Sequence, residues 1–309
     1  MSVRGGIHPV KIGDVYENYK IEKYLGQGEF STVWKTEDNY AIKIVKSAKV
    51  YAAAAKNEIQ VLSAIERNEY LMNLIDSFTI RGPNGKHYCL IVEFLGPSLV
   101  DGGALQIDIV RRYSAQLVKG LKFMQQKRII HTDLKLENIL IHNDTVKIAD
   151  FGNAISYDEK KKPTTIQTRQ YRAPEVILGD KYNYTADIWS LGCIIFELIT
   201  GDLLFNPSYK NGITREHHLK EIIEILGNFP TSALRGKFWR EFLTLEGKLR
   251  NLHDISPFPL ELLLIYEYNI SPPIVAEIIE FVLPMLAIEN ALRYIPETCK
   301  FICQQVNEV

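Results

Sequence analysis

The chain has 309 residues, a formal net charge of −1 and a charged fraction of 24%. This length allows one large domain or two smaller ones, and the near-neutral charge argues against a nucleic-acid-binding protein that works through bulk positive charge. The longest apolar runs, around Ile194 and Leu262, are interrupted by Glu197 and Glu267 and are too short to span a bilayer.

The four cysteines lack the paired spacing of a zinc site, which suits a reducing compartment. The N-terminus has no apolar core of the kind found in signal peptides. We therefore expect a monomer in the cytoplasm, the nucleus or both, with no direct contact to nucleic acid or membrane.

Residues 1–18 carry little periodicity and are predicted to be an extension before the fold. The next part, 19–45, is rich in strand formers and is interrupted by Gly26-Gln27-Gly28. Two glycines let a backbone turn tightly and approach phosphates closely, although such a pair is more often an ordinary hairpin turn. Lys43 follows between apolar neighbours and is either an edge residue or a phosphate ligand.

A helix is predicted over 51–65, where four alanines favour it and Ala55, Ile59 and Leu62 form one apolar face. Its Glu58 is either a solvated surface residue or a partner for a buried cation. Strands are predicted at 74–80 and 87–94, joined by a Gly-Pro-Asn-Gly turn.

The stretch 131–152 carries most of the predicted chemistry. Two short β-rich runs flank an Asn/Asp turn, and a hairpin centred on Asp144 would set Asn138 opposite Asp150. Amide and carboxylate oxygens are the ligands that Mg²⁺ prefers. Asp133 and Lys135 lie just upstream. The alternative is an exposed polar loop between buried strands.

Helical periodicity is predicted at 107–124 and again around Leu219 to Leu226. Between them, 186–200 is apolar nearly all round, which is typical of a buried helix, and Gly201 is a candidate C-cap.

The complete string resembles the protein kinases. His131-Thr132-Asp133 to Asn138, Asp150-Phe151-Gly152 and Ala173-Pro174-Glu175 match the motifs of that family, and Ser31 replaces the third glycine of its phosphate loop. The resemblance runs from Tyr19 to about Gln305. It implies an α+β bilobal fold: a β-rich N-lobe at about 19–93, a hinge at about 93–97 and a helical C-lobe at about 98–309.

The resemblance also implies roles for individual residues. Asp133 orients the substrate hydroxyl and accepts its proton, Lys135 neutralises the moving phosphoryl group, and Asn138 and Asp150 hold Mg²⁺. Asp187 braces the catalytic loop, and Glu175 pairs with Arg293. The implied ATP-binding residues are Leu25, Gly26, Gln27, Gly28, Glu29, Phe30, Ser31, Thr32, Val33, Lys43 with its partner Glu58, and the hinge residues Glu93 and Leu95.

Within the kinases the chain looks most like the SR-protein kinases, which phosphorylate serines in Arg-Ser repeats of proteins involved in RNA processing. The strings that carry this resemblance are Gly28-Glu29-Phe30-Ser31-Thr32-Val33-Trp34, Ile166-Gln167-Thr168-Arg169-Gln170-Tyr171-Arg172 and Gly201-Asp202-Leu203-Leu204-Phe205. In that family, three arginines matching Arg169, Arg172 and Arg215 receive a phosphoserine already made on the substrate.

Several features depart from that family. Phe151 stands where its members usually have leucine, Leu136 replaces a proline, and the family's long spacer is missing after Leu140. Of its acidic docking groove, Glu216, Glu221 and Glu224 remain, with Lys220 at helical spacing to Glu216 and Glu224. His217 replaces an acid, and Lys160-Lys161-Lys162 would repel an arginine-rich chain if it faced the cleft.

Two alternatives remain open. A LAMMER-type dual-specificity kinase is supported by Phe151 and the Ala-Pro-Glu motif and is weakened by Ile222-Ile223-Glu224. A pseudokinase that only binds partners is disfavoured, because Lys43, Glu58 and the three catalytic and metal-binding residues are all present.

Overall fold

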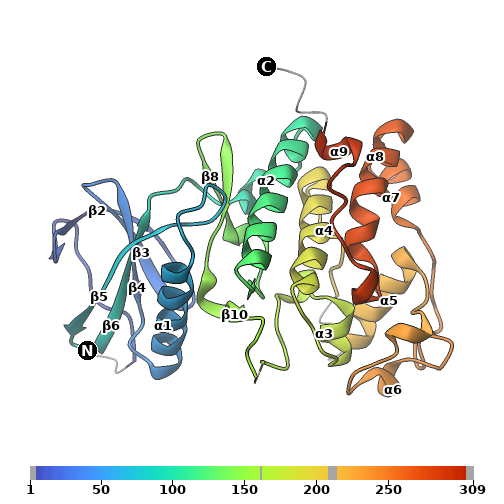
Figure 1. Ribbon diagram of the computed structural model, residues 1–309, viewed down its shortest axis with the longest axis horizontal. Coiled ribbons are helices and arrows are strands. Elements are labelled where there is room, and N and C mark those ends of the chain that lie inside the picture. The colour runs from blue at the N-terminus through green and yellow to red at the C-terminus, as the bar shows by residue number, and fades with distance from the viewer. Residues whose placement is uncertain (1–4, 161, 208–213, 304–309) are drawn as a thin grey trace. The chain divides into compact units, whose positions relative to one another are not determined.

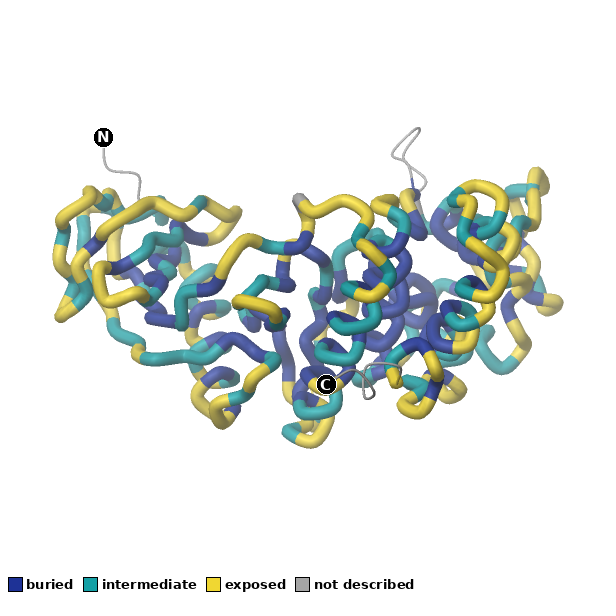
Figure 2. The backbone as a smooth tube through the Cα atoms, turned by 90° about the horizontal axis from the view of Figure 1, so that it is seen from above, coloured by how far each residue is buried: buried dark blue, intermediate teal, exposed yellow. Residues whose placement is uncertain are grey.

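The computed structural model describes residues 5–160, 162–207 and 214–303. The chain separates into two compact units, residues 1–98 with 140–154, and residues 99–139 with 155–309. In each unit the buried residues form a continuous interior, drawn dark blue in Figure 2. Among the described residues, no helix is both long and apolar enough to cross a membrane.

The first unit is built on one antiparallel sheet of six strands in the order β1-β2-β3-β4-β6-β5 (Figure 1). Its strands are β1 (Val15–Tyr16), β2 (Tyr19–Gln27), β3 (Ser31–Thr36), β4 (Tyr40–Val45), β5 (Leu74–Gly82) and β6 (Gly85–Glu93). A core cluster of Ile21, Ile42, Ile44, Cys89 and Ile91 lies on one face of this sheet. The strands predicted at 74–80 and 87–94 are therefore present, each a little longer or shifted by one or two residues.

One helix, α1 (Lys49–Ala64), packs against β4, β5 and β6. Ala55 and Leu62 are buried on its inner face, as predicted, and so is Glu58.

The predicted N-terminal extension is not separate from the fold. Residues 5–18, which we call the N-terminal strap, supply strand β1 and pack Val10 and Tyr16 against the sheet core. The imidazole of His8 lies 5.0 Å from the ring of His87. Backbone hydrogen bonds join Gly5 to Asn84 (3.2 Å) and Ser47 to Gly6 (3.2 Å), immediately before α1 begins.

The hairpin of β8 (Ile139–His142) and β9 (Thr145–Ile148) has a two-residue loop, Asn143-Asp144. The pairing is therefore centred between Asn143 and Asp144, half a residue earlier than the predicted centre at Asp144.

Residues 140–154 group with the first unit rather than with the C-terminal residues, which differs from the predicted lobe boundary. The reason is backbone pairing, because Gly96 N–H donates to Ile141 (2.7 Å) and Met72 N–H donates to Ile148 (2.8 Å).

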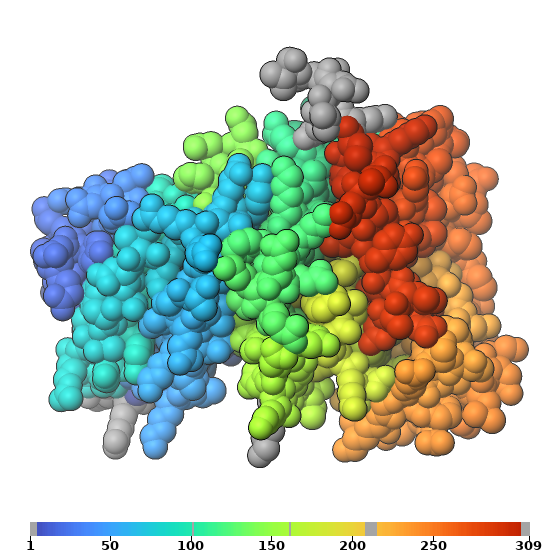
Figure 3. Space-filling view, viewed as in Figure 1, coloured from blue at the N-terminus to red at the C-terminus, as the bar shows by residue number. Residues whose placement is uncertain are grey.

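The second unit is helical. Its longer helices are α2 (Ile107–Gln126), α4 (Thr185–Thr200), α5 (Thr214–Leu226), α7 (Leu260–Tyr266) and α8 (Pro272–Val282). Its shorter elements include α3 (Pro174–Leu178), α6 (Trp239–Phe242), α9 (Lys300–Cys303) and the strand pair β7 (Ile129–Ile130) and β10 (Ile155–Ser156). Figures 1 and 3 show the C-terminal residues, in red, against α2, in green, where α9 packs on α2.

Helix α4 forms the centre of this unit. All but two of its residues, Glu197 and Thr200, are buried, and Trp189 stacks on Phe205 at 5.6 Å. Gly201 ends the helix with φ of 80°, a left-handed conformation that glycine adopts without steric cost, as predicted.

Candidate active site

In the first unit, Lys43 from β4 bonds to two carboxylates. Its Nζ donates to Glu58 Oε1 and Oε2 (3.0 and 2.8 Å) and to Asp150 Oδ1 (2.9 Å). The Glu58 side chain is 2% exposed, which excludes the alternative of a solvated surface glutamate. Burial alone would lower the pKa of Lys43, but Glu58 and Asp150 outweigh it and raise the pKa, so the lysine stays charged.

Asp150 begins a turn that packs against α1. Its φ is 64°, and Phe151 after it is completely buried. The side-chain amide of Asn57, on α1, donates to the carbonyl of Ala154 (2.6 Å). The helix that positions Glu58 is thus hydrogen-bonded to the segment that positions Asp150.

The glycine-containing loop between β2 and β3 is closed by Gly28 N–H donating to Ser31 (3.0 Å), while Leu25 and Phe30 are exposed. Neither Gly26 nor Gly28 has a positive φ, and a Cβ on either would meet nothing within 4 Å. The turn itself therefore does not require glycine at either position. The protein itself tolerates a side chain at both positions, so any steric demand for glycine has to come from a ligand.

The side chain of Glu93 is hydrogen-bonded to other residues of the protein. Its carboxylate accepts bonds from Lys147 Nζ (2.8 and 2.9 Å) and from the backbone and side-chain amides of Asn73 (both 2.8 Å). Leu95 is buried. Contacts of Glu93 and Leu95 with a nucleotide base must therefore use their backbone groups. No local sequence pattern pointed to Lys147, because it lies 54 positions from Glu93.

In the second unit, Asp133 is held by a residue that the motif did not include. Its Oδ1 accepts bonds from the hydroxyl (2.6 Å) and the N–H (3.2 Å) of Thr168. Lys135 Nζ lies 3.8 Å from Asp133 Oδ2. Oδ2 of Asp133 thus lies beside Lys135 and is the oxygen suited to receive a proton.

Asn138 is buried beside Asp133, and its amide NH₂ donates to the Asp133 carbonyl (2.8 Å). This bond orients the amide and leaves its oxygen as an acceptor, which is the group a hard cation binds. The described residues hold no cluster of three or more His, Cys, Asp or Glu side chains suited to a metal. A metal here would depend on few protein ligands, as Mg²⁺ with phosphate does.

A residue of helix α4 holds the backbone of the catalytic loop in place. Asp187, 2% exposed, accepts bonds from the N–H groups of His131 (2.7 Å) and Thr132 (3.0 Å). Burial raises the pKa of Asp187, while these bonds and His131 oppose the rise. Thr132 has φ of 70°, a strained conformation for a β-branched residue that the surrounding bonds maintain.

Comparison with known proteins agrees with this geometry. Residues 19–304 match the family described as protein kinase domain. The chain belongs to the protein kinase family. A crystal structure of another kinase domain, 26% identical, superposes with a TM-score of 0.82 over 96% of this chain and 98% of that one. The predicted α+β kinase fold and the assignment as a serine/threonine protein kinase are confirmed.

Three curated relatives match this kinase over most of their length. The serine/threonine-protein kinase SRPK of Physarum polycephalum is 34% identical over 94% of this chain and 86% of its own. Protein kinase dsk1 of Schizosaccharomyces pombe is 29% identical, over 94% and 81%. SRSF protein kinase 3 of Homo sapiens is 26% identical, over 95% and 86%. The resemblance to the SR-protein kinases is thereby confirmed.

The kinase brings its three predicted substrate arginines together. Burial lowers the pKa of Arg172, and the charges of Arg169 and Arg215 lower it further. Arg172 also donates to the carbonyls of Ile166 (3.0 Å) and Gln167 (2.7 Å), so part of its guanidinium group braces the loop backbone. Arg215 lies 4.1 Å from the ring centre of Phe238.

The predicted acidic groove on α5 is altered. Glu216 is buried and accepts a bond from Asn251 N–H (3.2 Å), so it cannot serve as a surface contact. Lys220 pairs with Asp254 (3.0 Å) and Glu224 (3.7 Å), not with Glu216 as predicted. The insert before α5, at 208–213, lies outside the described residues.

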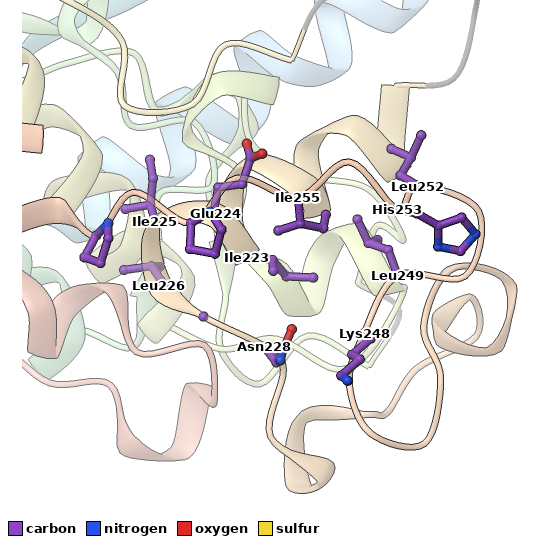
Figure 4. Close-up of a pocket in the computed structure, with 13 residues that line it drawn as sticks. Ile223, Glu224, Ile225, Leu226, Asn228, Lys248, Leu249, Leu252, His253 and Ile255 are labelled. Atoms are coloured by element: carbon purple, nitrogen blue, oxygen red, sulfur yellow. The ribbon is translucent and has the colours of Figure 1, made fainter.

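Two acids of α5 still line a hollow of about 340 Å³, together with Tyr268 and Phe258. Burial raises the pKa of Glu221 to about 7, and its Oε2 has no hydrogen-bond partner within the described protein. A second hollow of about 560 Å³ lies between the end of α5 and residues 248–259. Its wall is mostly aliphatic, with Ile223, Leu249 and Ile255 facing one another (Figure 4).

Glu175 and Arg293 form the ion pair that the resemblance implies. Arg293 NH1 and NH2 donate to the two Glu175 oxygens (2.8 and 3.0 Å), and NH1 also donates to the Thr185 carbonyl (2.9 Å). The arginine side chain is fully buried and lies over Trp189.

Proposed function

We propose that this kinase phosphorylates serines in arginine-serine-rich protein segments. The observation that carries the proposal is that Arg169 and Arg215 lie near Arg172, where the charges of both add to burial in lowering its pKa. Guanidinium groups bind phosphate oxygens bidentately, so a phosphoserine already on the substrate would be held there while the next serine reacts.

The hollow beside α5 supports the arginine half of this specificity. Glu221 is a partly buried carboxylate with one unpartnered oxygen, and Glu224 and Tyr268 lie in the same wall. A guanidinium group entering this hollow would satisfy the carboxylate and stack on an aromatic ring. The retained groove is therefore smaller than the one implied by resemblance and centres on Glu221 rather than Glu216.

The residues of this chain divide the catalytic work as follows. Lys43, held by Glu58, binds phosphate oxygens of ATP. Asn138 and Asp150 would hold Mg²⁺, which when bound neutralises phosphate charge. Asp133, oriented through Thr168, positions the serine hydroxyl and takes its proton, and Lys135 stabilises the developing negative charge.

The test compares an Arg-Ser repeat peptide with a serine peptide of acidic context, each at low and at physiological salt. We expect a clear preference for the Arg-Ser peptide, which Arg169→Ala/Arg215→Ala reduces mainly at the second and later serines. Glu221→Gln should raise KM for the Arg-Ser peptide. Arg81→Ala and Glu246→Gln, at exposed positions outside these sites, are the matched controls. Equal rates on the two peptides, or faster reaction of the acidic one, would refute the proposal.

A further inference from the structure

Two lysines of the run at 160–162, Lys160 and Lys162, line a hollow that the proposed function does not use. Lys160 and Lys162 lie in its wall with Lys181 and Arg235, and the hollow has a volume of about 1000 Å³. Lys161 is outside the described residues and is not part of the argument. All four cations belong to the second unit, although they come from three separate segments of the chain.

The cations of this hollow are not neutralised by the protein. Among the described residues, no carboxylate forms an ion pair with Lys160, Lys181 or Arg235, and all three side chains are exposed. Nearby Arg128 differs, because Asp158 binds its guanidinium bidentately (both 2.6 Å). The only carboxylates in the lining are Glu159 and Asp180, so the described walls carry a surplus of two positive charges.

One lysine is also held in place by aromatic rings. Lys162 Nζ lies 4.7 Å from the ring centre of Tyr157 and 5.7 Å from that of Tyr182. The Tyr182 hydroxyl donates to the Pro163 carbonyl (2.8 Å), which ties this stretch to the residues after α3. The Lys162 side chain is therefore partly ordered before any ligand binds, which reduces the conformational entropy lost on binding.

We propose that this hollow binds a phosphoserine-bearing peptide segment. A phosphate group carries between about −1.5 and −2 charges at pH 7, which matches the surplus in the walls. The volume accommodates several residues, and Asn183 and Asn290 in the lining can bond to a peptide backbone. Glu159 and Asp180 interrupt the positive surface, which disfavours the continuous backbone of a nucleic acid.

This site is distinct from the cluster of Arg169, Arg172 and Arg215, because none of those arginines lines the hollow. A kinase whose product is phosphoserine supplies the ligand itself. The hollow would then hold segments that have already reacted, while the arginine cluster acts at the serine being phosphorylated. This last step rests on the proposed function, whereas binding of phosphoserine does not.

The experiment measures binding of a fluorescent peptide carrying two phosphoserines, by anisotropy, to the full chain with Arg169→Ala/Arg215→Ala. This background removes two of the three arginines of the other cluster and so weakens binding there. We expect the phosphopeptide to bind at least about tenfold more tightly than its unphosphorylated form, and Lys181→Ala/Arg235→Ala to abolish that difference, since it removes charged hydrogen-bond donors to the phosphate. Lys122→Ala/Lys300→Ala removes two cations on α2 and α9 as the control.

Three results would overturn the proposal. The first is equal affinity for the phosphorylated and unphosphorylated peptides. The second is retention of phosphopeptide binding in Lys181→Ala/Arg235→Ala. The third is stronger competition by a single-stranded RNA or by anionic vesicles than by the phosphopeptide. Inorganic phosphate serves as a further competitor: displacement only at concentrations far above those of the peptide is expected, because the free ion lacks the backbone contacts. A loss of Arg-Ser preference without loss of this binding would refute the proposed function alone.

Discussion

Asp133 illustrates how a catalytic carboxylate is oriented by a residue outside its own motif. Thr168 donates two hydrogen bonds to Oδ1, which directs Oδ2 away from the threonine and beside Lys135. The sequence motif identified the carboxylate but not its orientation, because the threonine lies 35 positions downstream.

We predict that Asp133→Asn abolishes phosphoryl transfer while leaving folding and ATP binding nearly intact, since a positioned base contributes about 10²–10⁴-fold. Thr168→Val keeps the backbone bond and removes the hydroxyl, so it should lower kcat by a smaller factor with KM for ATP unchanged. Steady-state kinetics and ATP titration measure both. Near-normal turnover of Asp133→Asn would show that this residue is misassigned.

Other residues show where sequence reasoning succeeded and failed. Lys43 and Glu58 were identifiable because each lies in a recognisable string, and the structure joins them directly. The side-chain contacts of Glu93 could not be predicted, since its partners Asn73 and Lys147 lie on other segments and no local sequence pattern links them. Arg172 also braces the loop backbone, because it donates to the Gln167 carbonyl.

At the scale of elements, the end of the segment 153–172 is anchored by Gln167, a residue for which the sequence predicted no individual role. Gln167 is buried, has φ of 66° and bonds through its side chain to Ala186, Ser190 and Ala173 (2.8, 2.9 and 3.0 Å). Its N–H also donates to the Thr132 carbonyl (2.8 Å). These bonds fix the segment without phosphate, and Thr132 offers no positive charge to a phosphate.

We therefore predict that the kinase is active without phosphorylation of this segment. Bacterially made, phosphatase-treated protein should keep its turnover, and Thr164→Ala/Thr165→Ala should change little. Gln167→Ala should lower turnover strongly, because it removes the hydrogen-bond partner of the Ala186 carbonyl, the Ser190 hydroxyl and the Ala173 N–H. Activity assays of the phosphatase-treated protein and of the two variants test this prediction, with circular dichroism as a folding control. A large loss on phosphatase treatment would contradict this account.

Helix α5 carries a buried histidine that makes stability depend on pH. Burial, with the nearby charges of Arg172 and Arg169, lowers the pKa of His218 to about 3. The unfolded chain, with a pKa near 6.5, then binds the proton more readily than the folded protein. The contribution of this histidine to the free energy of unfolding is fully present above about pH 6.5. It decreases as the pH drops from about 6.5 towards 3, by about 1.4 kcal/mol per pH unit.

The prediction is measured by urea unfolding between pH 7 and pH 5. The His218→Gln protein has no imidazole to titrate here, so its free energy of unfolding should fall less steeply than that of the wild type. The difference between the two slopes isolates this histidine from His8, whose pKa is also lowered by burial. Parallel slopes would mean that His218 is not the titrating group.

Element prediction from sequence was most reliable where the periodicity was strong. The buried helix α4 and its glycine cap followed from an apolar run and one residue type. The N-terminal strap was missed, because its anchoring depends on a few side chains and on backbone bonds to residues 47 and 84. Such contacts leave no periodic pattern in the strap itself.

At the scale of the whole molecule, the family resemblance predicted the fold, yet the assignment of residues to compact units needed the structure. The hairpin with Asp150 lies late in the sequence but pairs with residues 70–72 and 96–98, and so groups with the N-terminal unit. The catalytic residues are consequently shared between the units, with Lys43, Glu58 and Asp150 in one and Asp133, Lys135 and Asn138 in the other.

A buried long-range ion pair in the second unit leads to the last prediction. Glu175 and Arg293 are 118 positions apart, and both are almost completely buried. Removing one partner leaves the other charge unpaired in the interior, which costs about 3–5 kcal/mol. Arg293→Met and Glu175→Gln should each lower the free energy of unfolding by this order, as measured by urea denaturation. The double variant should lose much less than the sum, because neither charge then remains buried alone. Additive losses would show that the two side chains stabilise the unit independently, through contacts such as the bond from Arg293 to Thr185, rather than as a pair.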